Sequence, residues 1–156
     1  LLFSQHFFSI VEHLLRVYVV CFQHGYILIQ QFNKKRMMLQ GVKLLPCDCI
    51  EPPTLLIGGG YDKQSSYEEW IQAFDGKVKQ LVLIGQTREK IEKTAHECGF
   101  FNTILAENLE EAVKICAEKA EAGDAVLLSP ACASWGQFDN YEQRGDKFKE
   151  YVRAML

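Results

Sequence analysis

Residues 54–63 read TLLIGGGYDK, and this stretch decides the fold of the chain. Residues 54–57 are a short apolar run, which is typical of a buried strand. The run ends in three consecutive glycines, which favour a tight turn. The stretch therefore predicts a strand that enters a glycine-rich turn before the next element of structure begins.

A regular alternation of predicted strands and helices continues to the end of the chain. Further strands are predicted at 81–84, 103–105 and 125–128. Between and after the strands lie four predicted helices: one capped by Ser65 or Ser66 and stopped at Asp75-Gly76, one from Thr87 to Cys98-Gly99, one from Asn108 to residues 122–124, and one at 138–155 with an interruption at Arg144-Gly145. Strands that alternate with helices of about ten to fifteen residues predict an α/β fold, here a Rossmann-like, mostly parallel sheet flanked by helices.

Residues 1–52 do not follow this rhythm and form an irregular N-terminal extension. Within it, 16–22 and 26–32 are compatible with a hairpin. The first fifty residues carry five Lys/Arg against two Asp/Glu, whereas the rest carries twelve against eighteen. This asymmetry predicts two unlike parts, an atypical segment at 1–52 and a domain at 53–156.

Composition excludes several classes of function. A net charge of −3 without a basic stripe argues against nucleic-acid binding. The apolar start is interrupted by Gln5, His6, Glu12, His13 and Arg16, so it lacks the roughly 18 apolar residues of a membrane span and is not a targeting segment. Six irregularly spaced cysteines without a C-x-x-C pair support neither a zinc site nor a disulfide framework. We therefore expect reduced thiols in the cytoplasm and no metal site.

The glycine turn is the first segment that could bind a ligand. Gly59 and Gly60 at the end of a strand would let backbone N–H groups approach an anion closely. Lys63 would add a positive charge, and Asp62 would add an acceptor. The spacing matches neither a phosphate loop nor the dinucleotide-binding fingerprint, so a ligand-facing turn and a purely structural turn stay equally open.

The second segment follows the last predicted strand and reads LSPACASWGQF at 128–138. Its small residues expose the backbone at the carboxyl edge of the sheet, where open α/β sheets bind ligands. Ser129 and Ser134 offer hydroxyls, and the amides near Ser134 could hold a carboxylate. No histidine in 125–156 would activate Cys132 as a nucleophile, so a packing role is favoured.

Two cations near this edge leave alternatives open. Lys90 lies one turn into the helix that follows Gly85 and could reach across the edge, although a solvated lysine is the default expectation. Arg144 could pair with a phosphate or carboxylate of a ligand, and a structural salt bridge is at least as well supported.

Three segments together carry a resemblance to a known family: LLIGGGYDK at 55–63, LVLIGQTREKI at 81–91 and GDAVLLSPACASWGQFDNYEQRGDKFKE at 123–150. In this order they resemble the C-terminal domain of the D-glutamate-adding branch of the Mur ligase family, over about residues 53–156. The most specific part is SPACAS, followed by Gln-Phe and then by an aromatic-x-x-Arg-Gly-Asp-x-Phe run. The DNPR-type motif of the branch that adds a diamino acid does not occur in the sequence.

The resemblance implies a function and its site residues. Such ligases use ATP and Mg²⁺ to activate UDP-N-acetylmuramoyl-L-alanine as an acyl phosphate, which the amine of D-glutamate attacks in peptidoglycan biosynthesis. Carried over by position, the resemblance implies D-glutamate binding by Ser134, Trp135, Tyr141, Lys90 and Ser65, and ATP-phosphate contacts by Gly59, Gly60, Asp62 and Lys63. It implies no catalytic residue and no metal ligand in this domain, because the central domain of the family binds most of the ATP and the Mg²⁺.

Departures from the family pattern limit what this chain does alone. No G-K-[ST] phosphate loop occurs in it, and the N-terminal and central ligase domains have no counterpart, so we expect no ligase activity from the chain by itself. Residues 1–52 also lack the Asn-Asp-Ser-Lys segment that normally precedes the glycine turn, which suggests a misread or frameshifted start. Two alternatives are a freestanding α/β module that binds an anion or nucleotide, and a fragment that self-associates or adheres to a membrane surface through its apolar start.

Overall fold

The computed structural model describes residues 16–19, 53–62, 64–121 and 124–155. Its elements are, in chain order, β1 Arg16–Val19, β2 Thr54–Gly59, α2 Glu68–Gln72, β3 Val78–Ile84, α3 Arg88–Glu97, β4 Thr103–Leu105, α4 Leu109–Lys119, β5 Ala125–Leu128 and α5 Tyr141–Ala154. All pairings in the five-stranded sheet are parallel, and the strand order is β1-β5-β2-β3-β4. The predicted α/β fold with a parallel sheet is confirmed.

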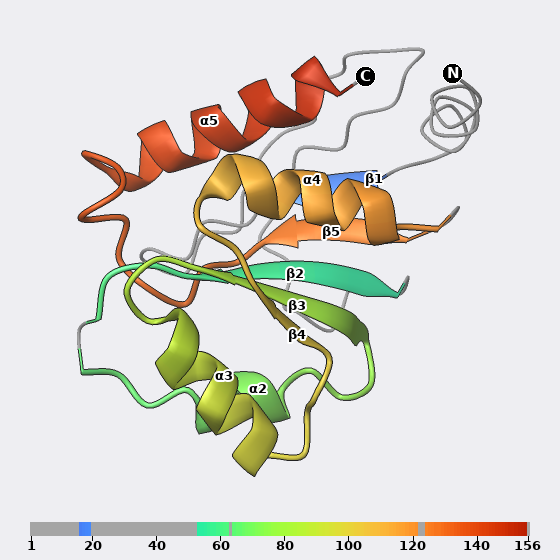
Figure 1. The fold of residues 1–156 in the computed structure, drawn as a ribbon, viewed down its shortest axis with the longest axis vertical. Coiled ribbons are helices and arrows are strands. Elements are labelled where there is room, and N and C mark those ends of the chain that lie inside the picture. Colours follow the sequence, from blue (N-terminus) through green and yellow to red (C-terminus); the bar gives the residue numbers. More distant parts are fainter. Residues whose placement is uncertain (1–15, 20–52, 63, 122–123, 156) are drawn as a thin grey trace.

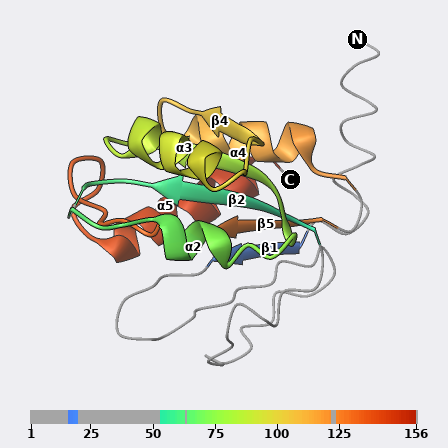
Figure 2. The ribbon, with the colours of Figure 1, turned by 90° about the horizontal axis from the view of Figure 1, so that it is seen from below.

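Helices cover both faces of the sheet. Helices α4 and α5 lie on one face, and α2 and α3 lie on the other (Figures 1 and 2). Strand β2 is central, so its side chains alternate between two buried layers: Leu55 and Ile57 pack toward α4 and α5, and Leu56 packs toward α2 and α3. Burial on both faces explains why this strand is an unbroken apolar run rather than an alternating one.

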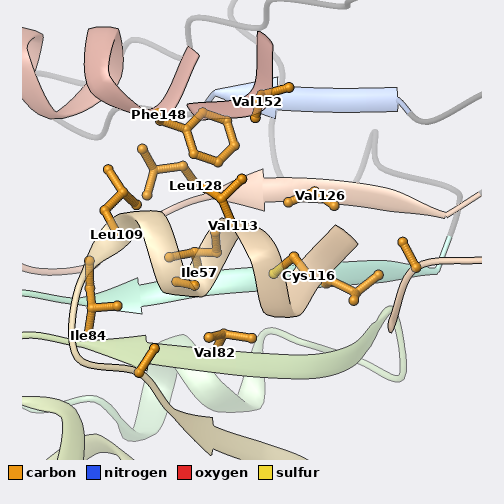
Figure 3. Close-up of a cluster of buried hydrophobic side chains, with 14 residues drawn as sticks. Ile57, Val82, Ile84, Leu109, Val113, Cys116, Val126, Leu128, Phe148 and Val152 are labelled. Carbon is orange, nitrogen blue, oxygen red and sulfur yellow. The ribbon is translucent and has the colours of Figure 1, made fainter. Parts of the chain in front are cut away.

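The larger core lies between the sheet and the α4–α5 layer. Figure 3 shows Phe148 and Val152 of α5 directed at Leu128 of β5, with Val113 of α4 beside them. Phe148 is fully buried. Because such burial contributes about 1.5–3 kcal/mol for each large apolar side chain, this layer fixes α5 to the sheet.

The predicted interruption at Arg144-Gly145 is wrong, because α5 runs without a break from Tyr141 to Ala154. A glycine inside a helix costs about 1 kcal/mol relative to alanine. The burial of Phe148 and Val152 on the same helix outweighs that cost.

The N-cap predicted for α4 is confirmed, whereas the N-cap side chains predicted for α2 and α3 do not bond to those helices. Asn108 caps α4 as predicted, since its side-chain oxygen accepts a hydrogen bond from the Glu111 amide at 2.9 Å. Neither Ser65 nor Ser66 caps α2, whose N-cap is Tyr67 without a side-chain bond, and the Ser66 hydroxyl donates instead to Glu68. Thr87 stands at the N-cap of α3 but does not bond to that helix.

Part of the N-terminal extension joins the sheet. Strand β1 pairs in parallel with β5, with Arg16 opposite Ala125 and Val19 opposite Leu128. The second strand of the predicted hairpin, 26–32, lies outside the described residues. Within the described part of the chain, no helix is long and apolar enough to cross a membrane.

Candidate functional site

The loops that follow β2 and β5 are joined by backbone hydrogen bonds. The Gly59 amide donates to the Pro130 carbonyl at 2.7 Å, and the Tyr61 amide donates to the Ala133 carbonyl at 3.0 Å. Tyr61 and Ala133 form an isolated antiparallel bridge. The glycine turn and the loop that carries Ser134 therefore meet at one edge of the sheet, at the carboxyl ends of its strands.

Glycine is required in this turn for steric reasons. A Cβ on Gly59 would lie 2.1 Å from the Ile84 carbonyl oxygen, and a Cβ on Gly60 would lie 2.4 Å from that of Ala133. Both residues also have positive φ angles, 97° and 149°. Their amides already bond within the fold, so the backbone of this turn serves structure, and phosphate binding by Gly59 and Gly60 stays a prediction.

Thr87 holds the glycine turn from the neighbouring loop. Its buried hydroxyl accepts a hydrogen bond from the Gly60 amide at 3.0 Å and donates to the Gly60 carbonyl at 3.2 Å. The Thr87 amide donates to the same carbonyl at 3.1 Å. Since the hydroxyl is used in this way, it is not available to cap α3.

A series of polar groups continues from Thr87 to the loop that carries Ser134, here called the serine loop. The Cys132 Sγ atom lies 3.3 Å from both the Thr87 hydroxyl oxygen and the Tyr67 hydroxyl oxygen. Burial, and then the bond to Cys132, raises the pKa of Tyr67, so this phenol stays neutral and can donate to the sulfur. With Thr87 donating to Gly60, the thiol donates to Thr87. This arrangement gives Cys132 a structural role, as the sequence favours.

Arg144 supports the same loop from α5. Its side chain is buried, and its Nη1 atom donates to the Cys132 carbonyl at 3.1 Å. An arginine so placed holds the backbone of the serine loop in position. The structure thus gives Arg144 a hydrogen bond to the protein backbone, which is neither the ligand contact nor the structural salt bridge that the sequence suggests.

Asp62 and Lys90 lie together at this edge. The Lys90 ammonium is 3.0 Å and 3.3 Å from the two carboxylate oxygens of Asp62 and stands 5.4 Å from the centre of the Tyr67 ring. Asp62 also accepts a bond from the Gln64 amide at 2.8 Å. The hydrogen bond from Lys90 is the main cause that lowers the pKa of Asp62.

The other predicted residues differ in how exposed they are. Ser134 is buried, and among the described residues its hydroxyl makes no hydrogen bond, while its carbonyl accepts from the Phe138 amide. Trp135 is 57% exposed, and Tyr141, the first residue of α5, is 39% exposed. Ser65 is exposed in the loop before α2. Lys63 lies outside the described residues.

An open cleft of about 530 Å³ lies beside these loops. It is lined by Gly60, Tyr61, Gly85, Gln86, Arg88, Glu89, Glu107, Trp135, Gly136 and Gln137. Of the predicted ligand-binding residues that the structure describes, only Gly60 and Trp135 line it. The rings of Trp135 and Tyr61 are 5.9 Å apart at an interplanar angle of 56°, and Arg88 pairs with Glu107 at 3.2 Å.

Sequence reasoning missed several of these cleft residues. Tyr61 and Gln86 directly follow strand-end glycines, so their positions alone could have indicated them. The pairing of Arg88 with Glu107 joins the start of one helix to the loop after β4, and no local pattern signals it.

Comparison with known proteins identifies relatives of the chain. Residues 38–132 match the family described as "Mur ligase, glutamate ligase domain". The chain is 48% identical over 145 residues to UDP-N-acetylmuramoylalanine--D-glutamate ligase of Lachnoclostridium phytofermentans, an alignment that covers 93% of this chain and 31% of the relative. It is 52% identical over 129 residues to the enzyme of the same name from a Thermoanaerobacter species, covering 81% of this chain and 28% of the relative. The chain thus spans about a third of the length of the curated relatives that it matches.

Among solved structures, UDP-N-acetylmuramate-alanine ligase of Thermotoga maritima aligns with a TM-score of 0.44 and 12% identity, over 68% of this chain and 21% of that one.

Proposed function

The chain belongs to the Mur ligase family, as its glutamate ligase domain, and from this premise we propose that it is the amino-acid-binding part of an ATP-dependent ligase. The ligase would join D-glutamate to UDP-N-acetylmuramoyl-L-alanine in cytoplasmic peptidoglycan biosynthesis. The names of relatives that are 48–52% identical to this chain support the proposal. This chain aligns with only about a third of the length of each relative. The activity, the substrates and the partner domains are therefore part of the proposal.

The observation that carries the proposal is the placement of Lys90 and Ser134 on elements that meet at one edge. A dicarboxylate amino acid needs cationic and hydroxyl donors, since charge-assisted bonds to carboxylates are the strongest ones available. Lys90 supplies the ammonium, and Ser134, a buried residue, supplies a hydroxyl that makes no hydrogen bond within the described residues. In this proposal Ser65 helps to hold a carboxylate, while Trp135 and Tyr141 frame the ligand.

The glycine turn would face the ATP phosphates through side chains. Asp62 and Lys63 are the proposed contacts, next to Gly59 and Gly60. Following the resemblance, we assign Mg²⁺ mainly to the central ligase domain of the family. Among the described residues no group of three or more His, Cys, Asp or Glu could hold a metal ion. This domain would bind and orient the amino acid and supply positive charge near the acyl phosphate.

The chain alone is expected not to turn over its substrates, because its sequence contains no G-K-[ST] phosphate loop. Incubation of the purified 156-residue chain with UDP-N-acetylmuramoyl-L-alanine, ATP and D-glutamate tests this, and release of phosphate together with the amide product would refute it. The interpretation of residues 1–52 as a misread start stays a prediction. It fails if no frame of the parent DNA upstream encodes a ligase-like sequence.

Calorimetric titration tests the binding proposal. We expect D-glutamate to bind, L-glutamate to bind at least tenfold more weakly, and the Lys90→Gln and Ser134→Ala variants to lose affinity. Binding of ADP without binding of D-glutamate would favour the alternative of a freestanding nucleotide-binding module, for which the cleft beside Tyr61 and Trp135 offers a place.

A further inference from the structure

The Lys90 ammonium is already engaged by a carboxylate of the protein. Its Nζ atom lies 3.0 Å and 3.3 Å from the two Asp62 oxygens, an arrangement that any substrate carboxylate bound to this lysine would reproduce. The ring of Tyr67 occupies another side of the ammonium, 5.4 Å away. A second carboxylate would therefore have to approach beside Asp62, against the repulsion between two like charges.

Asp62 is built so that it can give up this contact. Its side chain is 31% exposed, so a displaced carboxylate regains hydration. It also keeps the hydrogen bond from the Gln64 amide at 2.8 Å, which does not involve Lys90. An ion pair this exposed is weak, so a well-placed ligand carboxylate can replace it.

We propose that Asp62 competes with a carboxylate of D-glutamate for Lys90 and thereby sets the affinity of the site for its amino acid. This inference rests on the proposed function, because it takes D-glutamate as the ligand of Lys90. Asp62 lies two residues after Gly60 of the glycine turn, so the exchange would move a negative charge at the proposed phosphate side of the site. Binding of the amino acid is thus thermodynamically coupled to the release of Asp62 from Lys90.

The test is calorimetric titration of the 156-residue chain with D-glutamate, comparing the natural sequence with Asp62→Asn. Asparagine keeps the shape and can still accept the bond from Gln64, but it removes the competing charge. We expect binding to become about two- to fivefold tighter, which matches the loss of one exposed ion pair.

The matched control is Asp146→Asn in α5. Asp146 pairs with Lys149 at 2.8 Å, so the same substitution removes the same charge from an equally simple ion pair elsewhere. We expect no change in D-glutamate affinity. A third variant, Asp62→Asn with Lys90→Gln, should bind no more tightly than Lys90→Gln alone, because the gain acts through Lys90.

The outcomes distinguish a failure of the Asp62 competition from a failure of the proposed function. If the natural chain binds D-glutamate but Asp62→Asn binds equally or less well, the competition is refuted and the proposed function stands. If Asp146→Asn gains as much as Asp62→Asn, net charge explains the effect and the competition is refuted as well. If neither the natural chain nor Asp62→Asn binds D-glutamate, the proposed function fails and this inference fails with it.

Discussion

The Thr87 hydroxyl oxygen lies 3.0 Å from the amide nitrogen of Gly60 and 3.2 Å from its carbonyl oxygen, so one side chain holds both polar groups of a residue 27 positions away. This contact links the loop after β3 to the loop after β2. Through the Tyr61–Ala133 bridge it reaches the loop after β5 as well. The three loops of the candidate site therefore form one connected unit.

Replacing Thr87 by valine should destabilise the chain by about 1–3 kcal/mol, because it leaves the buried Gly60 amide without its acceptor while it preserves side-chain shape. Serine keeps the hydroxyl and should recover most of this loss. The midpoint of urea unfolding measures both variants. The role assigned to Thr87 would be refuted if Thr87→Ser were as unstable as Thr87→Val.

Gly60→Ala should lower the free energy of unfolding by more than the strain of a positive φ angle accounts for, because the new Cβ would lie 2.4 Å from the Ala133 carbonyl oxygen. Gly76→Ala is the matched control, since Gly76 also has a positive φ, 73°, but has open space around its Cβ position. Backbone strain of about 1–2 kcal/mol is expected for the control, and a clearly larger loss for Gly60→Ala. Equal unfolding midpoints for the two variants would contradict the close approach of the two loops.

The carboxyl group of Asp62 should titrate below its ordinary pKa of 3.8, because Lys90 stabilises its charged form. Since the pKa is lowered in the folded chain, the contribution of this pair to stability is present above the ordinary value and is lost as the pH falls below it. In Lys90→Gln the pKa should rise toward 3.8, while that of Asp146, which Lys149 lowers, stays in place. Carbon-detected NMR titration of the side-chain carboxyls measures both groups, and an unmoved Asp62 would rule out the pairing.

Phe148→Ala should lower the free energy of unfolding by about 3–5 kcal/mol, because it leaves a cavity at the fully buried position between α5 and the sheet. Lys147 on the same helix pairs with Glu150 at the surface, and its replacement by alanine should leave the free energy of unfolding nearly unchanged. Urea unfolding compares the two. Similar small losses would mean that α5 does not belong to the core.

The fold could be predicted because local patterns dominate it. Strands β2 and β5 are buried along their whole length, and β3 is buried over its last four residues, so a short apolar run identifies each of them without reference to the rest of the chain. Strand β4 coincides with its predicted range, as does β5. Asn108 could be identified as a cap because its partner, Glu111, lies only three residues away.

The candidate site could be predicted only in outline, because its contacts join residues far apart in the sequence. The partners of Thr87 and Lys90 lie 27 and 28 positions away, and the hydroxyl of Tyr67 meets Cys132 across 65. No pattern of spacing reveals such pairs. A threonine before a helix is ordinarily assigned as its cap, so the hydrogen bonds that Thr87 makes to Gly60 could be recognised only in three dimensions.

The pairing of β1 with β5 also has a consequence for how much of the chain is needed. Without Arg16–Val19, the border of the sheet would move from β1 to β5, so the apolar residues Ala125–Leu128 would have unbonded N–H and C=O groups along one side. Exposed borders of this kind recruit strands from other molecules and lead to aggregation. A shortened chain that begins at the glycine-turn strand would therefore be expected to precipitate more readily than the 156-residue chain, whatever ligand it binds.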